Sequence, residues 1–376
     1  MILRLPILRL PTERSPTDRS PTDRSSPHRS SPHRLPRRTF LSALGAGLVG
    51  AGSAAPVLSC KWIGDAGAAE LRVALVVKNL GNGFFEAAKN GGLEAAKALG
   101  GVEVIYTGPT TPTAEGQIEI IGALIAQKVD AIVVSANDPD ALVPICKRAM
   151  SRGITVLSFD SGLAPAGRLF QINASSPELI GQKQIEMVHQ TLGGQGEIAI
   201  LSATAQATNQ NTWIGVMKSV LAKPENAGLK LVDVAYGDDQ SDKSYREAIG
   251  LLRKHPNLKA IIAPTTVGIT AAAKAVTDQH LVGKVFVTGL GLPSEMAGHV
   301  HAGAVERFAI WNPVDLGYTA VYAAQQVITK NASGKPGTSV AAGRMGTLQI
   351  GPNGDAAMAQ PFVFDKSNVD QFAKLF

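Results

Sequence analysis

From residue 71 onward, short apolar runs alternate with amphipathic segments without a gap, and this alternation constrains the fold more than any other feature. The predicted strands of the first series are Val73–Val77, Val102–Tyr106, Ala131–Ser135 and Thr155–Phe159, with helices at Phe84–Leu99, Ala114–Gln127 and Ala141–Arg152. Strands that alternate with helices form right-handed βαβ units around a parallel sheet. We therefore expect an α/β fold with a doubly wound lobe here.

A second series of the same kind begins after Asn173–Ser176. Its predicted strands are Ile198–Leu201, Leu231–Ala235, Ala260–Ala263, Val285–Thr288 and Val305–Ile310. Its predicted helices are Leu179–Leu192, Asn211–Leu221, Lys243–Lys254, Gly268–Thr277, Ser294–Ala302 and Leu316–Thr329. The tail adds a strand at Thr347–Ile350 and a helix at Asn368–Leu375. Two doubly wound lobes would enclose a cleft lined by loops from the carboxyl ends of both sheets.

The net positive charge of the chain comes from its first 60 residues. The 376 residues carry a formal net charge of +6, and residues 1–60 hold nine arginines against three acidic residues. Residues 61–376 hold 27 basic and 27 acidic residues. The body of the chain therefore lacks the basic excess that tracks phosphates, and we expect no nucleic-acid partner.

Residues 1–68 are predicted to be a disordered leader followed by an export signal. Residues 14–34 are a Pro-, Ser- and Arg-rich repeat without an apolar period, a composition that cannot bury a core. Arg37-Arg38 then precede a short, weakly apolar segment. A twin arginine in this position is typical of Tat export, and the segment is poor as a transmembrane helix, which needs about 20 strongly apolar residues. We expect the mature protein in the periplasm.

The end of the signal has two interpretations. Val57-Leu58-Ser59-Cys60 resembles a lipoprotein cleavage box, in which Cys60 would be lipidated, although Leu58 is a poor residue for such a box. Ala66-Gly67-Ala68 offers an ordinary small-residue cleavage site instead. The mature chain is therefore either lipid-anchored through Cys60 or free.

The loop after the first predicted strand is the first candidate binding segment. It carries the cation Lys78 and the amides Asn79 and Asn82, and the rings of Phe84 and Phe85 follow it. Donors for hydroxyl groups beside flat apolar faces suit a small polyol. The alternative is that the two Phe side chains are core residues of the first helix.

The sequence contains no catalytic, metal-binding or nucleotide-binding signature. No Ser/His/Asp or Cys/His arrangement stands out, and Gly289-Leu290-Gly291 lacks the third glycine of a dinucleotide fingerprint. His299 and His301 are spaced by two but have no evident ligand partner, and Cys146 lies in a predicted helix. We expect a protein that is not an enzyme and needs no cofactor or metal.

Several of these segments together resemble a known family. The matching motifs are Lys78–Phe85, Tyr106–Thr110, Ser135–Asp140, Phe159–Ser161, Thr208–Trp213, Ala263–Thr266 and Ala309–Pro313. They resemble the rhamnose-binding proteins of bacterial ABC sugar importers, whose wider relatives are the ribose-type periplasmic binding proteins and the autoinducer-2 receptors. The likeness covers about Leu71 to Phe376.

The resemblance implies two lobes joined by three crossovers, as in periplasmic binding proteins of type I. We place these crossovers near Asn173–Ser175, Trp311–Pro313 and Gly343–Met345. Residues 71–174 and 313–343 would then form lobe 1, and residues 175–312 and 344–376 lobe 2.

The resemblance also implies a set of ligand-binding residues. They are Lys78, Asn82, Phe84, Phe85, Asp160, Asn209, Gln210, Pro264, Thr266, Trp311 and Asn312. Asp160 follows the fourth strand, where a carboxylate can accept two sugar hydroxyls, or simply end the strand as a turn residue. Asn209 has a helix N-cap as its alternative role. Trp311 would stack on a sugar face, or be a core or hinge side chain.

Three positions depart from the relatives. Autoinducer-2 receptors carry an acidic residue where this chain has Asn209 and a small one at Thr266. The ribose-type proteins have an Asp at Leu290, and a leucine there suits a ligand with a methyl group or is simple packing. These departures favour a plain deoxysugar over autoinducer-2.

The expected function is capture of rhamnose or a close monosaccharide by a monomer, and delivery to the permease of an ABC importer. The alternatives are an autoinducer-2 receptor and a sugar sensor that feeds a membrane signalling protein. An enzyme on this scaffold is disfavoured by the missing catalytic set. A transcription regulator of the related fold is disfavoured by the export signal.

Overall fold

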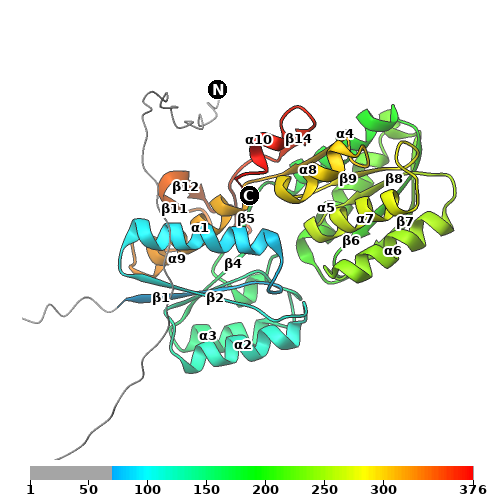
Figure 1. Cartoon of the computed structure of the whole chain (residues 1–376). Coiled ribbons are helices and arrows are strands. Elements are labelled where there is room, and N and C mark those ends of the chain that lie inside the picture. The colour runs from blue at the N-terminus through cyan, green and yellow to red at the C-terminus, as the bar shows by residue number, and fades with distance from the viewer. Residues whose placement is uncertain (1–69, 376) are drawn as a thin grey trace, which may run out of the picture. The chain divides into compact units, whose positions relative to one another are not determined.

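The computed structural model describes residues 70–375, which form two α/β lobes (Figure 1). The first lobe is built on six parallel strands in the order β13-β5-β4-β3-β1-β2. These strands are β1 (Leu71–Val76), β2 (Val102–Thr107), β3 (Ala131–Val134), β4 (Thr155–Phe159), β5 (Gln171–Asn173) and β13 (Asp355–Ala357). The fold class predicted from the alternation of elements is confirmed.

Both faces of this sheet are covered by helices, as its unbroken apolar strands require. The helices are α1 (Gly83–Leu99), α2 (Ala114–Ala126), α3 (Val143–Ser151) and α9 (Pro313–Ile328). Val73 and Leu75 of β1 pack in the core with α1 and α9, and Ala74 and Val76 pack with α2 and α3. Buried Cys146 belongs to the second of these cores, and burial raises the pKa of its thiol to about 12.

Helices α1 and α9 approach each other unusually closely. A Cβ added to Gly317 would lie 1.8 Å from the carbonyl oxygen of Ala88, and one added to Gly91 would lie 1.8 Å from that of Val314. Glycine costs helix stability, so its presence at both positions is explained by the backbone contact that only glycine permits.

The second lobe is built on four parallel strands in the order β7-β6-β8-β9. They are β6 (Gly196–Ser202), β7 (Leu229–Tyr236), β8 (Leu258–Ala263) and β9 (Phe286–Gly289). β10 (Arg307–Ile310) continues the sheet through a parallel bridge between Leu290 and Ala309, and β14 (Phe362–Asp365) pairs antiparallel with β10. Its helices are α4 (Pro177–Leu192), α5 (Thr208–Leu221), α6 (Ser241–Lys254), α7 (Thr266–Asp278), α8 (Pro293–His301) and α10 (Val369–Phe372).

Short elements complete the described chain. The antiparallel pair of β11 (Ser339–Ala341) and β12 (Thr347–Gln349) packs near α9 in the first lobe. Three 3-10 turns are η1 (Pro165–Gly167), η2 (Pro224–Asn226) and η3 (Gly343–Met345). The strands β5, β11, β13 and β14, each of three or four residues, were not predicted.

The path of the tail corrects one predicted boundary. Residues 344–376 were assigned to lobe 2, with a crossover at Gly343–Met345, but β13 pairs with β5 in the first sheet. The backbone NH groups of Met358 and Ala359 then bond to the carbonyls of Asn173 and Ala174. The third crossover therefore lies between β13 and β14, beside the first, because the parallel pairing with β5 holds the tail in lobe 1 up to that point.

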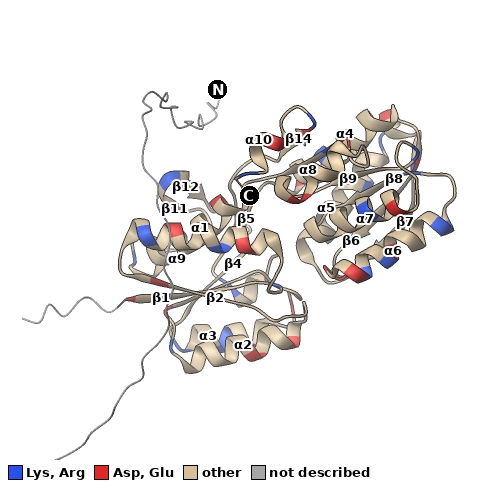
Figure 2. Cartoon of the chain, in the orientation of Figure 1, with Lys and Arg blue, Asp and Glu red and all other residues tan. Residues whose placement is uncertain are grey.

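Some expectations lie outside the described residues, namely the disordered leader, the twin-arginine signal and the lipidation of Cys60. Within residues 70–375, no helix has the length and apolar character needed to cross a membrane. The same residues contain no group of three His, Cys, Asp or Glu side chains placed to hold a metal. Basic and acidic side chains are interspersed over both lobes (Figure 2).

Candidate ligand-binding site

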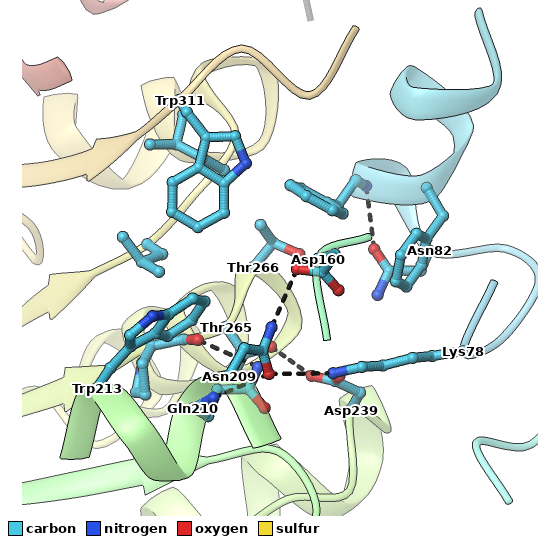
Figure 3. Close-up of a pocket in the computed structure, with 15 residues that line it drawn as sticks. Lys78, Asn82, Asp160, Asn209, Gln210, Trp213, Asp239, Thr265, Thr266 and Trp311 are labelled. Atoms are coloured by element: carbon cyan, nitrogen blue, oxygen red, sulfur yellow. Dashed lines mark hydrogen bonds between the residues drawn. The ribbon is translucent and has the colours of Figure 1, made fainter. Parts of the chain in front are cut away.

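A cavity lies where loops of the two sheets meet (Figure 3). From the first lobe it is lined by the loops that follow β1 and β4. From the second it is lined by the start of α5 and by the segments that follow β7, β8, β9 and β10. Carboxyl ends of parallel strands are where open α/β sheets bind ligands.

Asp160 is placed in this cavity by the backbone directly after β4. Its φ of 55° is in the left-handed region, which Asp tolerates better than most residues, and this turn presents the carboxylate to the cavity. Ser135 Oγ donates a 2.8 Å hydrogen bond to Oδ2, and Asn209 Nδ2 donates a 3.0 Å bond to Oδ1. The second of these bonds comes from the other lobe.

The pKa of Asp160 is raised above its ordinary value of 3.8, chiefly because burial disfavours the charged form. The nearby charge of Lys78 and the bonds from Ser135 and Asn209 oppose the rise, and the charge of Asp239 adds to it. Burial has removed water from this carboxylate. A ligand can take the place of that water by donating hydrogen bonds to the carboxylate oxygens.

Lys78 extends from the end of β1 toward the second lobe (Figure 3). Its side chain is buried, and its ammonium group makes a long bond of 3.5 Å to Asn209 Oδ1. Within residues 70–375 it forms no ion pair with a carboxylate, although both Asp160 and Asp239 line the same cavity. A buried cation with unused donor capacity favours a ligand rich in acceptor oxygens.

The start of α5 supplies two amide side chains. Asn209 joins Lys78 and Asp160, and its Oδ1 also accepts a 2.8 Å bond from the backbone NH of Gln210. Gln210 Nε2 donates to the carbonyl of Pro264 at 3.3 Å, and its buried Oε1 has no partner among the described residues. An orphaned buried acceptor that lines a cavity indicates a missing polar partner.

The segments after β7 and β8 form another wall of the cavity. Pro264 and Thr266, both predicted, line it together with Thr265 and Asp239, which were missed. Thr265 Oγ1 donates a hydrogen bond to Asp239 Oδ1. The signal for Asp239 was present, because Asp238-Asp239 lie in the loop that begins after the predicted strand Leu231–Ala235.

Aromatic rings from three segments surround one end of the cavity. Phe84 of α1 meets Trp311 edge-to-face at a centroid distance of 6.1 Å, and Trp311 meets Trp213 of α5 at 5.7 Å. Phe85 lines the cavity and also packs on Phe159 at 6.4 Å, so it serves the core as well. The buried Nε1 of Trp311 has no described partner, which leaves a donor free beside the rings.

The remaining predicted residues take different places. Asn82 lines the cavity, caps α1 by accepting a 3.0 Å bond from the NH of Phe84, and donates its Nδ2 to no described residue. Asn312 is not brought to the cavity. Its Oδ1 accepts from the NH of Val314 and its Nδ2 donates to Asp315, so it is the N-cap of α9, a role that asparagine favours.

Leu290 and Ile310 close the cavity with apolar surface. Leu290 is buried and follows β9, at the position where the resemblance led us to weigh a methyl contact. The site thus combines a carboxylate, a cation and amides with aromatic and aliphatic faces, which is the lining of a site for a small, polar ligand with apolar C–H faces.

Two parallel-sheet lobes around such a cavity define a solute-binding protein. A family model described as "periplasmic binding protein domain" matches residues 73–332. The chain therefore belongs to the periplasmic binding protein family, whose members bind ligands and are not enzymes.

Individual relatives agree with this assignment. A solute-binding protein of an ABC transporter from Clostridium phytofermentas, solved with bound L-rhamnose, is 36% identical, with a TM-score of 0.79 over 82% of this chain and 100% of its own. The D-ribose/D-allose-binding protein of Pseudomonas aeruginosa is 29% identical over 58% of this chain and 70% of its own. A protein of Clostridium saccharobutylicum in complex with AI-2 is 22% identical, with a TM-score of 0.76 over 80% of this chain and 98% of its own, a likeness of fold alone.

Proposed function

We propose that this solute-binding protein captures L-rhamnose, or a close monosaccharide, and delivers it to the permease of an ABC importer. The observation that carries the proposal is the pairing of unused buried polar groups with an apolar wall. Lys78, Gln210 Oε1 and Trp311 Nε1 are available to hydroxyl groups, while Leu290 is available to a methyl group. L-Rhamnose, a 6-deoxy sugar, has both kinds of surface. The rhamnose-bound relative from Clostridium phytofermentas supports the same ligand.

The proposed ligand-binding residues are the ten predicted side chains that line the cavity, with Trp213, Asp239, Thr265 and Leu290 added. Asp160 would accept hydrogen bonds from sugar hydroxyls in place of the hydrogen bond that it now accepts from Asn209 Nδ2. Micromolar affinity needs about −8 kcal/mol, and each hydrogen bond to a charged group contributes about 1.5–3 kcal/mol, so a few such bonds in an enclosed site suffice.

The two lobes suit a cycle of closure and release. Asp160 and Lys78 belong to the first lobe and Asn209 to the second, so a ligand that contacts all three favours the closed arrangement. The closed monomer would dock on the permease outside the cytoplasmic membrane. A receptor that feeds a membrane signalling protein would use the same lobes, and genomic neighbours distinguish the two.

Titration calorimetry of the purified protein tests the proposal. The ligands are L-rhamnose, L-mannose, D-ribose, D-allose and autoinducer-2. L-Mannose is the sharpest control because it differs from L-rhamnose only by a hydroxyl on the methyl carbon. Preference for L-rhamnose supports the proposal. Preference for autoinducer-2 moves the function to signal capture, and binding of none of the sugars contradicts the proposal.

A further inference from the structure

A second cavity adjoins the first between the lobes. It extends from the loop Gly162–Pro165 to the first crossover near Asn173 and Ser175, and reaches Thr212 on α5. The two cavities share four lining residues, which are Asp160, Asn209, Trp213 and Trp311. The candidate site therefore has a neighbouring chamber, and both lobes contribute to both volumes.

The bond between Asp160 Oδ1 and Asn209 Nδ2 joins two residues that line both cavities. These are the groups that a bound sugar would itself engage under the proposed function. A ligand hydroxyl that donates to the carboxylate in place of Asn209 Nδ2 would lie beside both cavities, because both residues line both.

The second cavity has the chemistry of a sugar site. Ser175 Oγ is buried and has no partner among the described residues. Arg168 donates hydrogen bonds to the carbonyls of Leu163 and Gly354 and to the carboxylate of Asp355. Because a guanidinium group has five N–H donors, others remain for a ligand. The indole rings shared with the first cavity provide flat apolar surface. Hydroxyl partners beside aromatic faces are the features that recognise a carbohydrate.

We propose that the second cavity binds a substituent on the sugar held in the first, so that this protein takes rhamnosides in which rhamnose is joined to a second hexose. The inference rests on the proposed function, because the rhamnose unit occupies the first cavity. The glycosidic oxygen accepts from the amide of Asn209, ring hydroxyls of the rhamnose unit donate to Asp160, and the second unit reaches Ser175 and Arg168.

Calorimetry with neohesperidose and rutinose, in which α-L-rhamnose is joined through its anomeric oxygen to glucose, tests the inference beside free L-rhamnose. We expect at least one disaccharide to bind as tightly as rhamnose or more tightly. Rhamnose binding with disaccharide affinity lower by about 100-fold or more, which is about 2.7 kcal/mol, overturns the inference and leaves the proposed function standing. Loss of binding of rhamnose and both disaccharides overturns both.

Two variants locate the second unit. Thr212 is exposed at the rim of the second cavity and does not line the first, so Thr212→Phe should obstruct only the second. We expect disaccharide affinity to fall by about 10-fold, or about 1.4 kcal/mol, because the ring occupies space that the second unit needs, while rhamnose affinity is unchanged. Thr212→Ser is the matched control, and Ser175→Ala should weaken the disaccharide alone. Equal effects of Thr212→Phe on both ligands contradict the assignment.

Discussion

Asn209 Nδ2 donates a 3.0 Å hydrogen bond to Asp160 Oδ1, and this bond connects the second lobe to the first beside the candidate site. Asp160 follows a strand of the first sheet and Asn209 begins a helix of the second lobe. The bond therefore forms only when the two lobes are close together. We expect loss of the Asp160 carboxylate to lower ligand affinity more than loss of any other group in the site.

Replacing Asp160 by asparagine should weaken sugar binding. The amide keeps the shape of the side chain but has no charge, so hydrogen bonds to it lose about half their strength. We expect affinity for the sugar to fall by about 100-fold, or about 2.7 kcal/mol, by calorimetry. Asp278→Asn, at an acidic residue at the end of α7, is the control. Unchanged affinity of the Asp160 variant would remove it from the site.

The same variant should be more stable than the natural chain when no ligand is bound. Burial raises the pKa of Asp160, so the folded state holds a proton that the unfolded state releases, and stability falls as pH rises from 3.8 through the raised pKa. Above that pH range the buried charge of Asp160 lowers the stability of the fold, and asparagine carries no such charge. Thermal unfolding at neutral pH should show a higher Tm for Asp160→Asn, with the difference shrinking toward pH 4. A lower Tm at neutral pH would show that the carboxylate stabilises the fold.

Sugar discrimination should depend on Leu290. Its buried side chain lines the cavity, and Leu290→Ser would place a hydroxyl partner where an apolar group now lies. Apolar pockets reject an added hydroxyl only by about 100-fold, so we expect the preference for L-rhamnose over L-mannose to shrink toward parity. Leu290→Met, which keeps the apolar volume, should keep the preference. A preference unaffected by serine would mean that the methyl group lies elsewhere.

The contact between α1 and α9 should be intolerant of a single methyl group. Gly317→Ala adds a Cβ that would lie 1.8 Å from the carbonyl oxygen of Ala88, so the helices must separate. Despite the better helix propensity of alanine, we expect a loss of about 1–3 kcal/mol in unfolding free energy, typical of overpacking. Chemical denaturation provides the measurement. Gly122→Ala on α2, where a Cβ would meet nothing within 4 Å, should be neutral or stabilising.

The Asp233 cluster on the second lobe should stabilise the fold above pH 4. Bonds from Lys254 at 2.8 Å and from His255 at 3.0 Å lower the pKa of Asp233 from 3.8 to about 2. A lowered folded pKa stabilises above the unfolded pKa, and the contribution is lost as pH falls from 3.8 to about 2. Asp233→Asn should therefore cost on the order of 1–2 kcal/mol at neutral pH after screening at this partly exposed site. Denaturant curves at pH 7 and pH 2.5 should differ accordingly, and an equal cost at both pH values would exclude the ionic origin.

Most of the long elements were predictable because their periods are clear. β4 was predicted at Thr155–Phe159 and lies there, and Asp160 could be placed at the cleft since loops after parallel strands converge. Asn312 was predicted to bind the ligand but caps α9 instead, because the second crossover and the start of this helix coincide at that residue. β13 was missed because three residues have no period, and only tertiary pairing with β5 reveals its lobe.

The candidate site was harder to complete where a side chain serves two purposes. Trp213 falls on the buried face of α5, where an aromatic residue is most simply explained as core, and only the packed structure shows that it also lines the cavity beside Trp311. Volume and orphaned polar atoms are properties of packed side chains, so neither the second cavity nor the free Ser175 hydroxyl has a signal in the amino-acid pattern.

The odd number of crossovers places the two ends of the described chain on opposite lobes. Leu71 begins β1 of the first sheet, while α10 is held to α8 in the second lobe by the 2.8 Å contact between Asp370 and His301. Fluorophores attached near residues 71 and 375 would therefore be carried by different lobes. Energy transfer between them would convert lobe closure into an optical signal, and the protein would serve as a reagentless biosensor for the ligand it encloses.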